Sequence, residues 1–308
     1  MEPLYLATGA SPHSGHVHEA VNCLQYYSYI RQLGFIFAGN AYTARGTLIH
    51  LGLAHSLAER GALQKGEKPG CKVGSGQFIQ GKNVVLPPLV AMERYYRENT
   101  ELLSQADFEN CTRAVLAWNT ANVINGHRIV GVEALLTGHV TMPWGSVPYT
   151  QRADLITQYR GNYYLWDHKS CYRMEKQAPA RYRFHFQFLG LETFGRTRYG
   201  KHFGGVVLNR LCLVPTKDGA YKHDQHNMAN DIFANTRFWD WVYQKKLMVK
   251  WAEDNFSDPW NWPRAMSESH CKTITGELCP GWNLCVHGQS AASHYERRGP
   301  QPSIATGE

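Results

Sequence analysis

Two aspartates and a lysine lie close together in the stretch QRADLITQYRGNYYLWDHKS and could do hydrolytic chemistry. Asp154 falls in one expected strand and Asp167 in the next, with 161–162 as the expected hairpin turn between them. Because strand side chains alternate between faces, Asp167 and Lys169 would point the same way and His168 the opposite way. The turn would bring Asp154 roughly opposite Asp167, so two carboxylates and an amine would converge at one edge of a sheet.

Phosphodiester hydrolysis is the chemistry that such a group supports. Two close carboxylates repel each other, and a hard divalent cation relieves the repulsion while drawing oxygen ligands. A cation held there can polarise a phosphoryl oxygen and activate a water molecule. A nearby lysine can orient or deprotonate that water, or stabilise the charge that builds up on the phosphorane. The alternative is a cross-strand ion pair between Asp154 and Lys169 with no catalytic role, worth well under ~1 kcal/mol if exposed.

The surrounding pattern predicts the elements that would position these residues. Apolar residues at helical spacing predict helices over 19–33, 44–60, 89–103, 179–198 and 227–253. Gly61 is expected to end the second of them. Short alternating or apolar runs predict strands over 127–142, 147–158, 162–168 and 206–211. This order predicts an α/β fold with a central mixed β-sheet flanked by helices.

The division of the chain follows from the same pattern. The 308 residues, 43% of them hydrophobic, can bury a sizeable core without disulfides or metals. We expect a single domain over 1–288, with a mainly helical part (19–110), a sheet core (127–214) and a helix with a cysteine segment (225–288). Residues 64–83 are expected to be loop, and the Ser/Gly/Pro-rich stretch 289–308 a disordered tail.

The net charge and the targeting signals of the sequence bear on the partner and the cellular location to be expected. Lys and Arg number 32 against 25 Asp and Glu, giving a net charge of +7 and a pI near 8.9. This balance fits a polyanionic partner without establishing one. The sequence shows no signal-peptide pattern and no run near 18 apolar residues, so we expect no membrane partner and a cytoplasmic protein. There, the eight cysteines are expected to be thiols or metal ligands rather than disulfides.

An ordered series of motifs resembles the PD-(D/E)XK nuclease superfamily. The series runs from a histidine in GTLIH and a glutamate in GVEAL to the aspartate in RADLI, the DHK triplet and a downstream glutamine. It is most similar to the RecB and AddB nuclease domains and their CRISPR-associated and phage relatives, over about residues 20 to 285. The resemblance implies a restriction-endonuclease-like core in a bacterial or phage-infected cytoplasm. It also implies a Mg²⁺- or Mn²⁺-dependent DNA exonuclease of recombination, repair or phage DNA metabolism.

The resemblance implies a metal site. His50, Asp154 and Asp167 would be ligands, joined by the backbone carbonyl of His168. Glu133 would support this site or hold a second metal. Alternatively, His50 lies on a leucine stripe and could be a helix histidine of the core or surface, and Glu133 could be a solvated charge at a strand end.

Two further catalytic roles come with the resemblance. Lys169 would be the catalytic lysine, and Gln187 would contact DNA or orient that lysine. Gln187 could instead be a polar position on an aromatic-rich helix. The chain departs from the family where relatives often carry a tyrosine four residues after the glutamine, because Leu191 stands there. The departure puts the details of substrate contact in doubt.

Three cysteines lie close together in CKTITGELCPGWNLC, with seven and five residues between them. This spacing argues against a zinc ribbon, whose ligand pairs lie two to four residues apart. The segment resembles the cluster segment of AddB-like and phage nucleases, in which an early cysteine supplies the fourth ligand. The resemblance therefore implies a [4Fe–4S] cluster held by Cys23, Cys271, Cys279 and Cys285, and buried thiols are the alternative.

Basic and aromatic residues crowd the sequence after the catalytic segment. Arg173, Lys176, Arg181 and Arg183 are interleaved with Tyr172, Tyr182, Phe184 and Phe186. The combination suits backbone contacts and base stacking on DNA, single-stranded or at duplex ends, although a solvated helix face is the alternative for each residue. A helicase or single-strand annealing protein is a further expected partner.

Two other functions compete with the nuclease. A non-catalytic DNA-binding subunit would keep the fold but need no metal, and the intact histidine, aspartates and lysine count against it. A thiol-based redox or zinc protein would be unrelated to nucleic acid, and the absence of C-x-x-C disfavours it.

Overall fold

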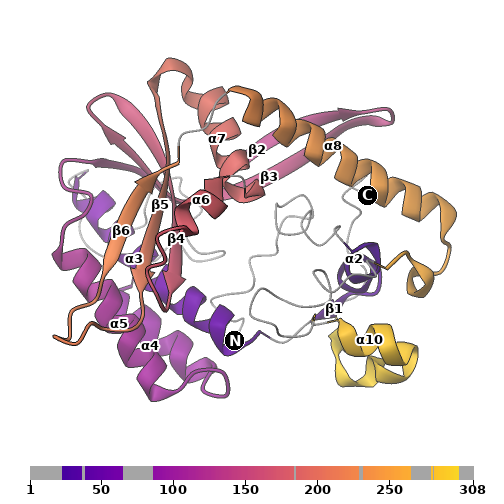
Figure 1. The fold of residues 1–308 in the computed structure, drawn as a ribbon, viewed down its shortest axis with the longest axis horizontal. Coiled ribbons are helices and arrows are strands. Elements are labelled where there is room, and N and C mark those ends of the chain that lie inside the picture. Colours follow the sequence, from indigo (N-terminus) through magenta and orange to yellow (C-terminus); the bar gives the residue numbers. More distant parts are fainter. Residues whose placement is uncertain are drawn as a thin grey trace. The chain divides into compact units, whose positions relative to one another are not determined.

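The computed structural model of the chain describes residues 23–36, 39–64, 86–183, 185–228, 232–264, 279 and 281–297. These residues form an α/β structure around a five-stranded mixed sheet flanked by helices, with a helical N-terminal part, which confirms the predicted fold class (Figure 1). The chain divides into two compact units. Unit 1 holds Met1–Thr8, Gly39–Leu136 and Gln151–Asn235, and unit 2 holds Gly9–Ala38, Thr137–Thr150 and Thr236–Glu308. The single domain over 1–288 stays a prediction.

The main sheet has the order β2-β3-β4-β5-β6. Its strands are β2 (Arg128–Met142), β3 (Gly145–Tyr159), β4 (Asn162–Cys171), β5 (Phe203–Cys212) and β6 (His223–Asn227). β4 runs antiparallel to β3 and parallel to β5, while β6 runs antiparallel to β5. The four predicted strands are confirmed. β6 was not predicted, because its polar sequence HDQHN shows no apolar alternation.

The turn between β3 and β4 lies one residue earlier than expected. Tyr159 pairs with Asn162, so Arg160 and Gly161 are the two turn residues. Both have positive φ, 49° and 83°, as a type I′ hairpin turn requires, and glycine adopts this conformation without steric cost. The guanidinium of Arg160 lies 5.1 Å from the centre of the Tyr159 ring. The expected turn at 161–162 is therefore wrong by one position, but the hairpin itself is confirmed.

Three helices of unit 1 precede the sheet: α3 (Ala41–Gln64), α4 (Pro88–Glu98) and α5 (Gln105–Thr120). α3 continues through Gly61, so the expected end at that glycine is wrong. A β-carbon on Gly61 would lie 3.1 Å from Ile129, so a glycine serves close packing there rather than a helix end. α5 was not predicted. It begins with a capping box between Ser104 and Asp107, a signal that the sequence carries.

The predicted helix over 179–198 is two helices, α6 (Ala178–Arg183) and α7 (Phe186–Tyr199), followed by a 3-10 turn, η1 (Gly200–His202). His185 separates them, because it is extended and its ring accepts a hydrogen bond from the first turn of α7. In β4, Trp166 packs into the core shared with α3 and α5. Lys169, three residues further along the strand, points to the other face and contacts α7. These helices therefore cover opposite faces of the sheet.

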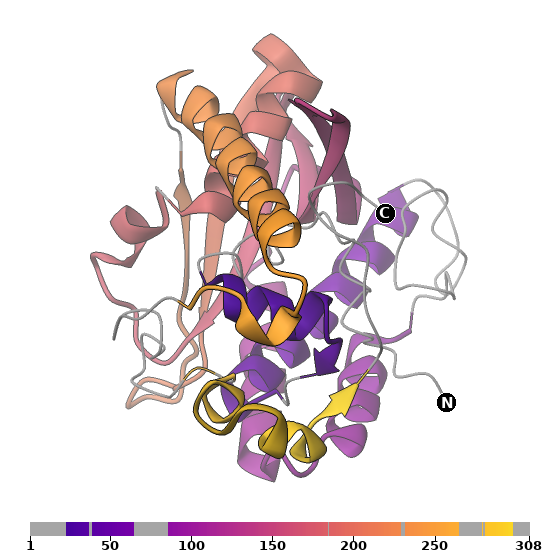
Figure 2. The same ribbon diagram turned by 90° about the vertical axis from the view of Figure 1, so that its right-hand side faces the viewer.

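Unit 2 combines segments from both parts of the chain. It contains α2 (Leu24–Arg31), β1 (Phe35–Ile36), most of α8 (Ile232–Asn255), η2 (Pro259–Asn261), α10 (Trp282–His287), η3 (Gly288–His294) and β7 (Glu296–Arg297). α2 lies beside the end of α8 and the segment after it (Figure 2), where the amide of Gln25 donates to the carbonyl of Pro263 at 2.9 Å. None of the helices in the described ranges is long and apolar enough to cross a bilayer.

Two sequence-based expectations differ from the secondary structure that unit 2 shows. The helix expected over 227–253 begins only at Ile232, after β6 has ended at Asn227. Residues 289–297 fall in the expected disordered tail, yet η3 buries Ala291 and β7 pairs antiparallel with β1. The expected loop 64–83, apart from residue 64, and the rest of the tail lie outside the described residues.

Candidate active site

Three side chains from three elements of unit 1 meet at the centre of the site. His50 comes from α3, Glu133 from β2 and Asp154 from β3, and one potential ligand atom of each lies within 4.8 Å of the others. Nδ1 of His50 is 3.5 Å from Oδ2 of Asp154. An imidazole nitrogen with two carboxylates is a donor set that suits a divalent cation such as Mn²⁺ or Mg²⁺. The three residues thus form a group able to hold a metal ion.

Glu133 has an unusual backbone conformation. Its φ is 49°, in the left-handed region, although it lies inside a strand. A glutamate in this conformation is sterically disfavoured and persists only where the surrounding structure holds it. Nη1 of Arg152, on β3, lies 3.3 Å from Oε2 of Glu133 and is one of the contacts that hold the side chain.

A second cluster adjoins the first across β4. The backbone amide of His168 donates to Oδ2 of Asp154 at 2.6 Å. Nζ of Lys169 lies 2.9 Å from Oδ2 of Asp167 and donates to Oε1 of Gln187 at 2.9 Å. Nε2 of Gln187 donates to the other oxygen of Asp167. Asp167 and Lys169 therefore share a face, as expected from strand alternation, and α7 supplies Gln187 to both.

Burial and mutual repulsion give the three carboxyl groups of the site different pKa values. Burial, and then the charge of Asp154, raise the pKa of Glu133 to about 7. Burial also raises the pKa of Asp167 to about 6, against the lowering effect of Lys169. Asp154 differs, because although burial opposes its ionisation, His50 holds the pKa of this carboxyl well below its usual range. Ionising all three carboxyls together is therefore costly near neutral pH, and a bound cation would reduce that cost.

The pKa values of the two histidines of the site are shifted in opposite directions. Burial opposes protonation of His50, but the Asp154 carboxylate outweighs it and raises the pKa of His50 to about 9. Burial lowers the pKa of His168 to about 4, so its ring is neutral. Nδ1 of His168 lies 2.8 Å from Nδ2 of Asn209, whose oxygen accepts from Trp118. The amide therefore donates to His168, and the neutral ring carries its proton on Nε2.

The structure brings together the side chains of His50, Glu133, Asp154, Asp167, Lys169 and Gln187, with the backbone of His168. Within this set Asp167 contacts Lys169 and Gln187 and does not belong to the group of three whose ligand atoms lie within 4.8 Å. Leu191, the position at which the nucleases that the sequence resembles often carry a tyrosine, is fully buried.

The predicted DNA-binding residues are all exposed. Arg173 and Lys176 lie in the segment that follows β4, and Arg181 and Arg183 lie on α6. Arg181 forms an ion pair with Glu175, and both side chains are more than half exposed. Such a pair is worth little in water, so the guanidinium can exchange partners for a phosphate.

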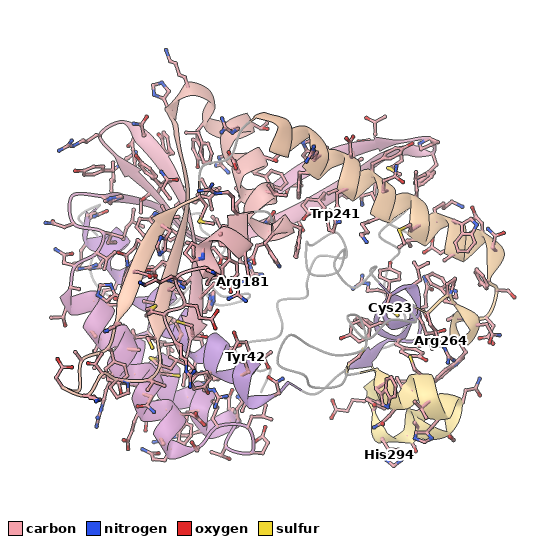
Figure 3. All side chains as sticks on the ribbon, in the orientation of Figure 1. Cys23, Tyr42, Arg181, Trp241, Arg264 and His294 are labelled. Carbon is pink, nitrogen blue, oxygen red and sulfur yellow. The ribbon has the colours of Figure 1, made fainter. Side chains whose placement is uncertain are left out.

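Three of the four predicted cluster cysteines lie near the same two tyrosines of α2, in unit 2. Cys23 and Cys279 both interact with Tyr26, and Cys23 and Cys285 with Tyr29; with burial, these thiols raise the pKa of both phenols. Figure 3 labels Cys23 at the start of α2 and Arg264, whose guanidinium donates to the carbonyl of Cys285 at 2.9 Å. Cys271 lies outside the described residues.

Sequence reasoning missed three supporting residues. Arg152 contacts Glu133, Asn209 orients His168, and Gln151 donates through its side-chain amide to the carbonyl of Gln187. Asn209 left a signal, because it is a polar residue within the largely apolar segment VVLNRLC of β5. A fully buried polar residue in such a run needs partners, which marks a specific hydrogen-bonding role.

No family model and no curated protein matches the sequence. Among solved structures, a protein of Eubacterium rectale described as a candidate exonuclease aligns with 91% of this chain and 96% of its own. The identity is 9% and the TM-score 0.46. The protein SSO0001 aligns with 53% of this chain and 67% of its own, at 13% identity and a TM-score of 0.26. Both TM-scores are below 0.5, so neither resemblance shows what the chain does.

Proposed function

We propose that the chain is a metal-dependent nuclease that hydrolyses phosphodiester bonds of DNA. The observation that carries the proposal is the junction of two clusters: the His50–Glu133–Asp154 group and the pair of Asp167 with Lys169. The hydrogen bond from the His168 amide to Asp154 links them. One cluster offers ligands for a cation and the other a fixed positive charge, which are the two requirements of phosphoryl chemistry.

Mg²⁺ or Mn²⁺ bound at the first cluster would polarise a phosphoryl oxygen and lower the pKa of a water molecule. His50, Glu133 and Asp154 would hold it. Following the resemblance described above, Asp167 and the backbone carbonyl of His168 would contribute further oxygens. The raised pKa of Glu133 fits this assignment, because a carboxyl forced to share space with Asp154 gains most from an added cation.

Lys169 would act as an electrostatic group. Its ammonium contacts Asp167 and Gln187, which account for two of its three hydrogens among the contacts of the described residues. The third can reach a phosphate oxygen or orient the attacking water. Although burial opposes its charge, Asp167 raises the pKa of Lys169, so the side chain keeps its proton and stabilises the negative charge of the transition state.

DNA is the proposed substrate because exposed positive charges adjoin the site. Arg173 and Lys176 follow the catalytic strand directly, and Arg181 and Arg183 come one short helix later. These side chains can contact backbone phosphates on either side of the cleavage point. In keeping with the resemblance, we propose exonuclease action at DNA ends during recombination, repair or phage DNA metabolism, with a helicase or annealing protein as partner.

The test is cleavage of end-labelled single-stranded and duplex DNA with Mg²⁺ or Mn²⁺, comparing wild type with Lys169→Ala. We expect metal-dependent cleavage that falls at least about 100-fold in the variant while folding and DNA binding persist. Lys222→Ala, an exposed lysine just before β6, is the matched control and should cut normally. A folded, metal-replete wild type that binds DNA without cutting it would establish the non-catalytic DNA-binding subunit instead.

We also propose that Cys23, Cys279, Cys285 and Cys271 hold a [4Fe–4S] cluster that braces unit 2. The support is the arrangement of the first three thiols around Tyr26 and Tyr29. Thiolates are the ligands that such a cluster takes, and four are required.

Iron and sulfide analysis of anaerobically purified protein tests this cluster. We expect about four of each per chain, and their loss in Cys23→Ser but not in Cys111→Ser, a buried cysteine of unit 1. Protein that is folded and free of iron would refute the cluster and leave the nuclease proposal untouched.

A further inference from the structure

Two tyrosines of unit 1 are unusually exposed. Tyr42, on the first turn of α3, is 48% exposed, and Tyr172, the first residue after β4, is 42% exposed. No other tyrosine in the described ranges is as accessible. A single exposed aromatic side chain is common, but exposed rings gathered beside a candidate active site can mark a binding surface.

Both tyrosines lie at the end of β4 that carries Lys169. One turn after Tyr42, α3 passes so close to this strand that a β-carbon on Gly46 would lie 3.8 Å from Oγ of Ser170, the neighbour of Lys169. The residue just before Gly46 connects the two elements. Arg45 is held by Asp107 at 2.8 Å, and its guanidinium lies 5.0 Å from the centre of the Tyr172 ring.

A third tyrosine completes the group from α6. Tyr182 is half-buried, with its ring centre 5.4 Å from that of Phe188. Burial raises the pKa of its phenol, which the charges of Lys169 and Tyr42 both influence, so Tyr182 belongs to the same region of unit 1. Tyr42 and Arg181, the neighbour of Tyr182, lie on the same edge of this unit in Figure 3.

We propose that Tyr42, Tyr172 and Tyr182 form a stacking surface for unpaired bases next to the cleaved phosphate, and that the substrate is therefore single-stranded DNA or a frayed end. The inference rests on the proposed function, because it uses the same Lys169 and the same strand. We call these three residues the tyrosine platform. Every base has a π-face, so the platform binds without regard to sequence, while paired bases inside a duplex cannot reach it.

The neighbouring charges fit this substrate. The guanidinium of Arg45 lies over one side of the Tyr172 ring and strengthens its position by a cation–π contact. The exposed Arg173 and Lys176 follow Tyr172 directly in sequence and can bind the phosphates between stacked bases. A positively charged path with aromatic steps is the usual arrangement of a single-strand site.

The test measures binding in EDTA, without cleavage, by fluorescence anisotropy of labelled oligo(dT) and of a blunt duplex. Tyr42→Leu and Tyr172→Leu remove the ring but keep an apolar side chain, while Tyr42→Phe and Tyr172→Phe keep the ring. We expect each Leu variant to bind oligo(dT) between about 5-fold and 100-fold more weakly, and each Phe variant to stay within about twofold of wild type. Duplex binding should change less than about twofold in all four.

A second measurement uses only the wild-type protein. An oligonucleotide of abasic sites keeps the phosphates and removes the bases, so it should lose at least as much affinity as either Leu variant. Oligo(dT) binding that is unchanged in both Leu variants, or equal binding of the abasic strand, would overturn the platform. Because neither measurement involves cleavage, the platform can fail while the nuclease stands, and the nuclease can fail while the platform stands.

Discussion

The backbone amide of His168 donates a 2.6 Å hydrogen bond to Oδ2 of Asp154. The bond fixes one carboxylate oxygen of β3 to the backbone of β4, between Asp167 and Lys169. A carboxylate that accepts a backbone hydrogen bond beside a protonated imidazole stays ionised, and the pKa of Asp154 lies well below its usual range. Asp154 thus supplies a fixed negative charge at the centre of the site.

Asp154→Asn should abolish metal binding. The amide oxygen can still accept from His168, so the hairpin keeps its geometry, but the negative charge that attracts the cation is gone. We expect Mn²⁺ affinity, measured by isothermal titration calorimetry, to fall more than about 100-fold, beyond the loss typical for residues that only support a ligand. Asp218→Asn, on an exposed turn of unit 1, is the control and should leave the affinity unchanged. Equal Mn²⁺ binding by the two variants would place the cation elsewhere.

Gln187→Met should slow the reaction without weakening DNA binding. The glutamine accepts from Lys169 and donates to Asp167, so it holds both at a fixed separation. Methionine has a similar length but makes neither bond. We expect kcat to fall about 10- to 100-fold with the DNA Kd within about twofold of wild type. A loss confined to the Kd would show that Gln187 contacts DNA rather than positioning the lysine.

Lys246→Met should remove a pH dependence from the stability of unit 2. Lys246, on α8, is fully buried and donates to the carbonyl of Pro148 at 3.1 Å. Burial lowers its pKa to about 7, whereas in the unfolded chain it is about 10.4. Between these values the unfolded chain binds more protons, so stability rises as pH increases from about 7 to 10.

Chemical denaturation at pH 7 and pH 9.5 measures this difference. Wild type should gain on the order of 2 kcal/mol between the two pH values, and Lys246→Met should lose most of that gain. Lys250→Met, whose amine contacts Asp254 on the same helix, controls for the loss of a surface charge. A slope that survives in Lys246→Met belongs to another group.

Gly52→Ala should destabilise unit 1, whereas Gly46→Ala on the same helix should not. A β-carbon on Gly52 would lie 2.5 Å from Sδ of Met92 and 3.1 Å from Val115, so these buried side chains or the helices that carry them would have to shift. Such overpacking costs about 1–3 kcal/mol. At Gly46 the nearest atom is 3.8 Å away, and alanine there gains up to about 1 kcal/mol of helix propensity. Thermal unfolding of the two variants should shift in opposite directions.

The hairpin that carries Asp154 and Asp167 could be predicted because its information is local. Alternating residues define both strands, and the register follows from the turn, so an error of one residue in the turn did not disturb the facing of the two aspartates. The three positions of Asp167, His168 and Lys169 likewise follow from strand alternation, which holds through β4.

The position of Glu133 could not be predicted in the same way. Its left-handed φ interrupts the alternation of β2, so the face of the side chain does not follow from its place in the sequence. Nor could the break between α6 and α7 be read from spacing, since apolar residues continue through it. It depends on the cap at His185. Partners distant in sequence, such as Asn209 for His168, emerge only from tertiary packing.

The pairing of β1 with β7 has a consequence for biosynthesis. Phe35 pairs with Arg297, so the small sheet of unit 2 cannot close until residues near 297 have left the ribosome. The described parts of unit 1 are complete by residue 235, well before that point. The nascent chain should therefore gain its candidate catalytic centre while α2 still waits for its C-terminal partners, which exposes Tyr27 and Tyr29 to chaperones during that interval.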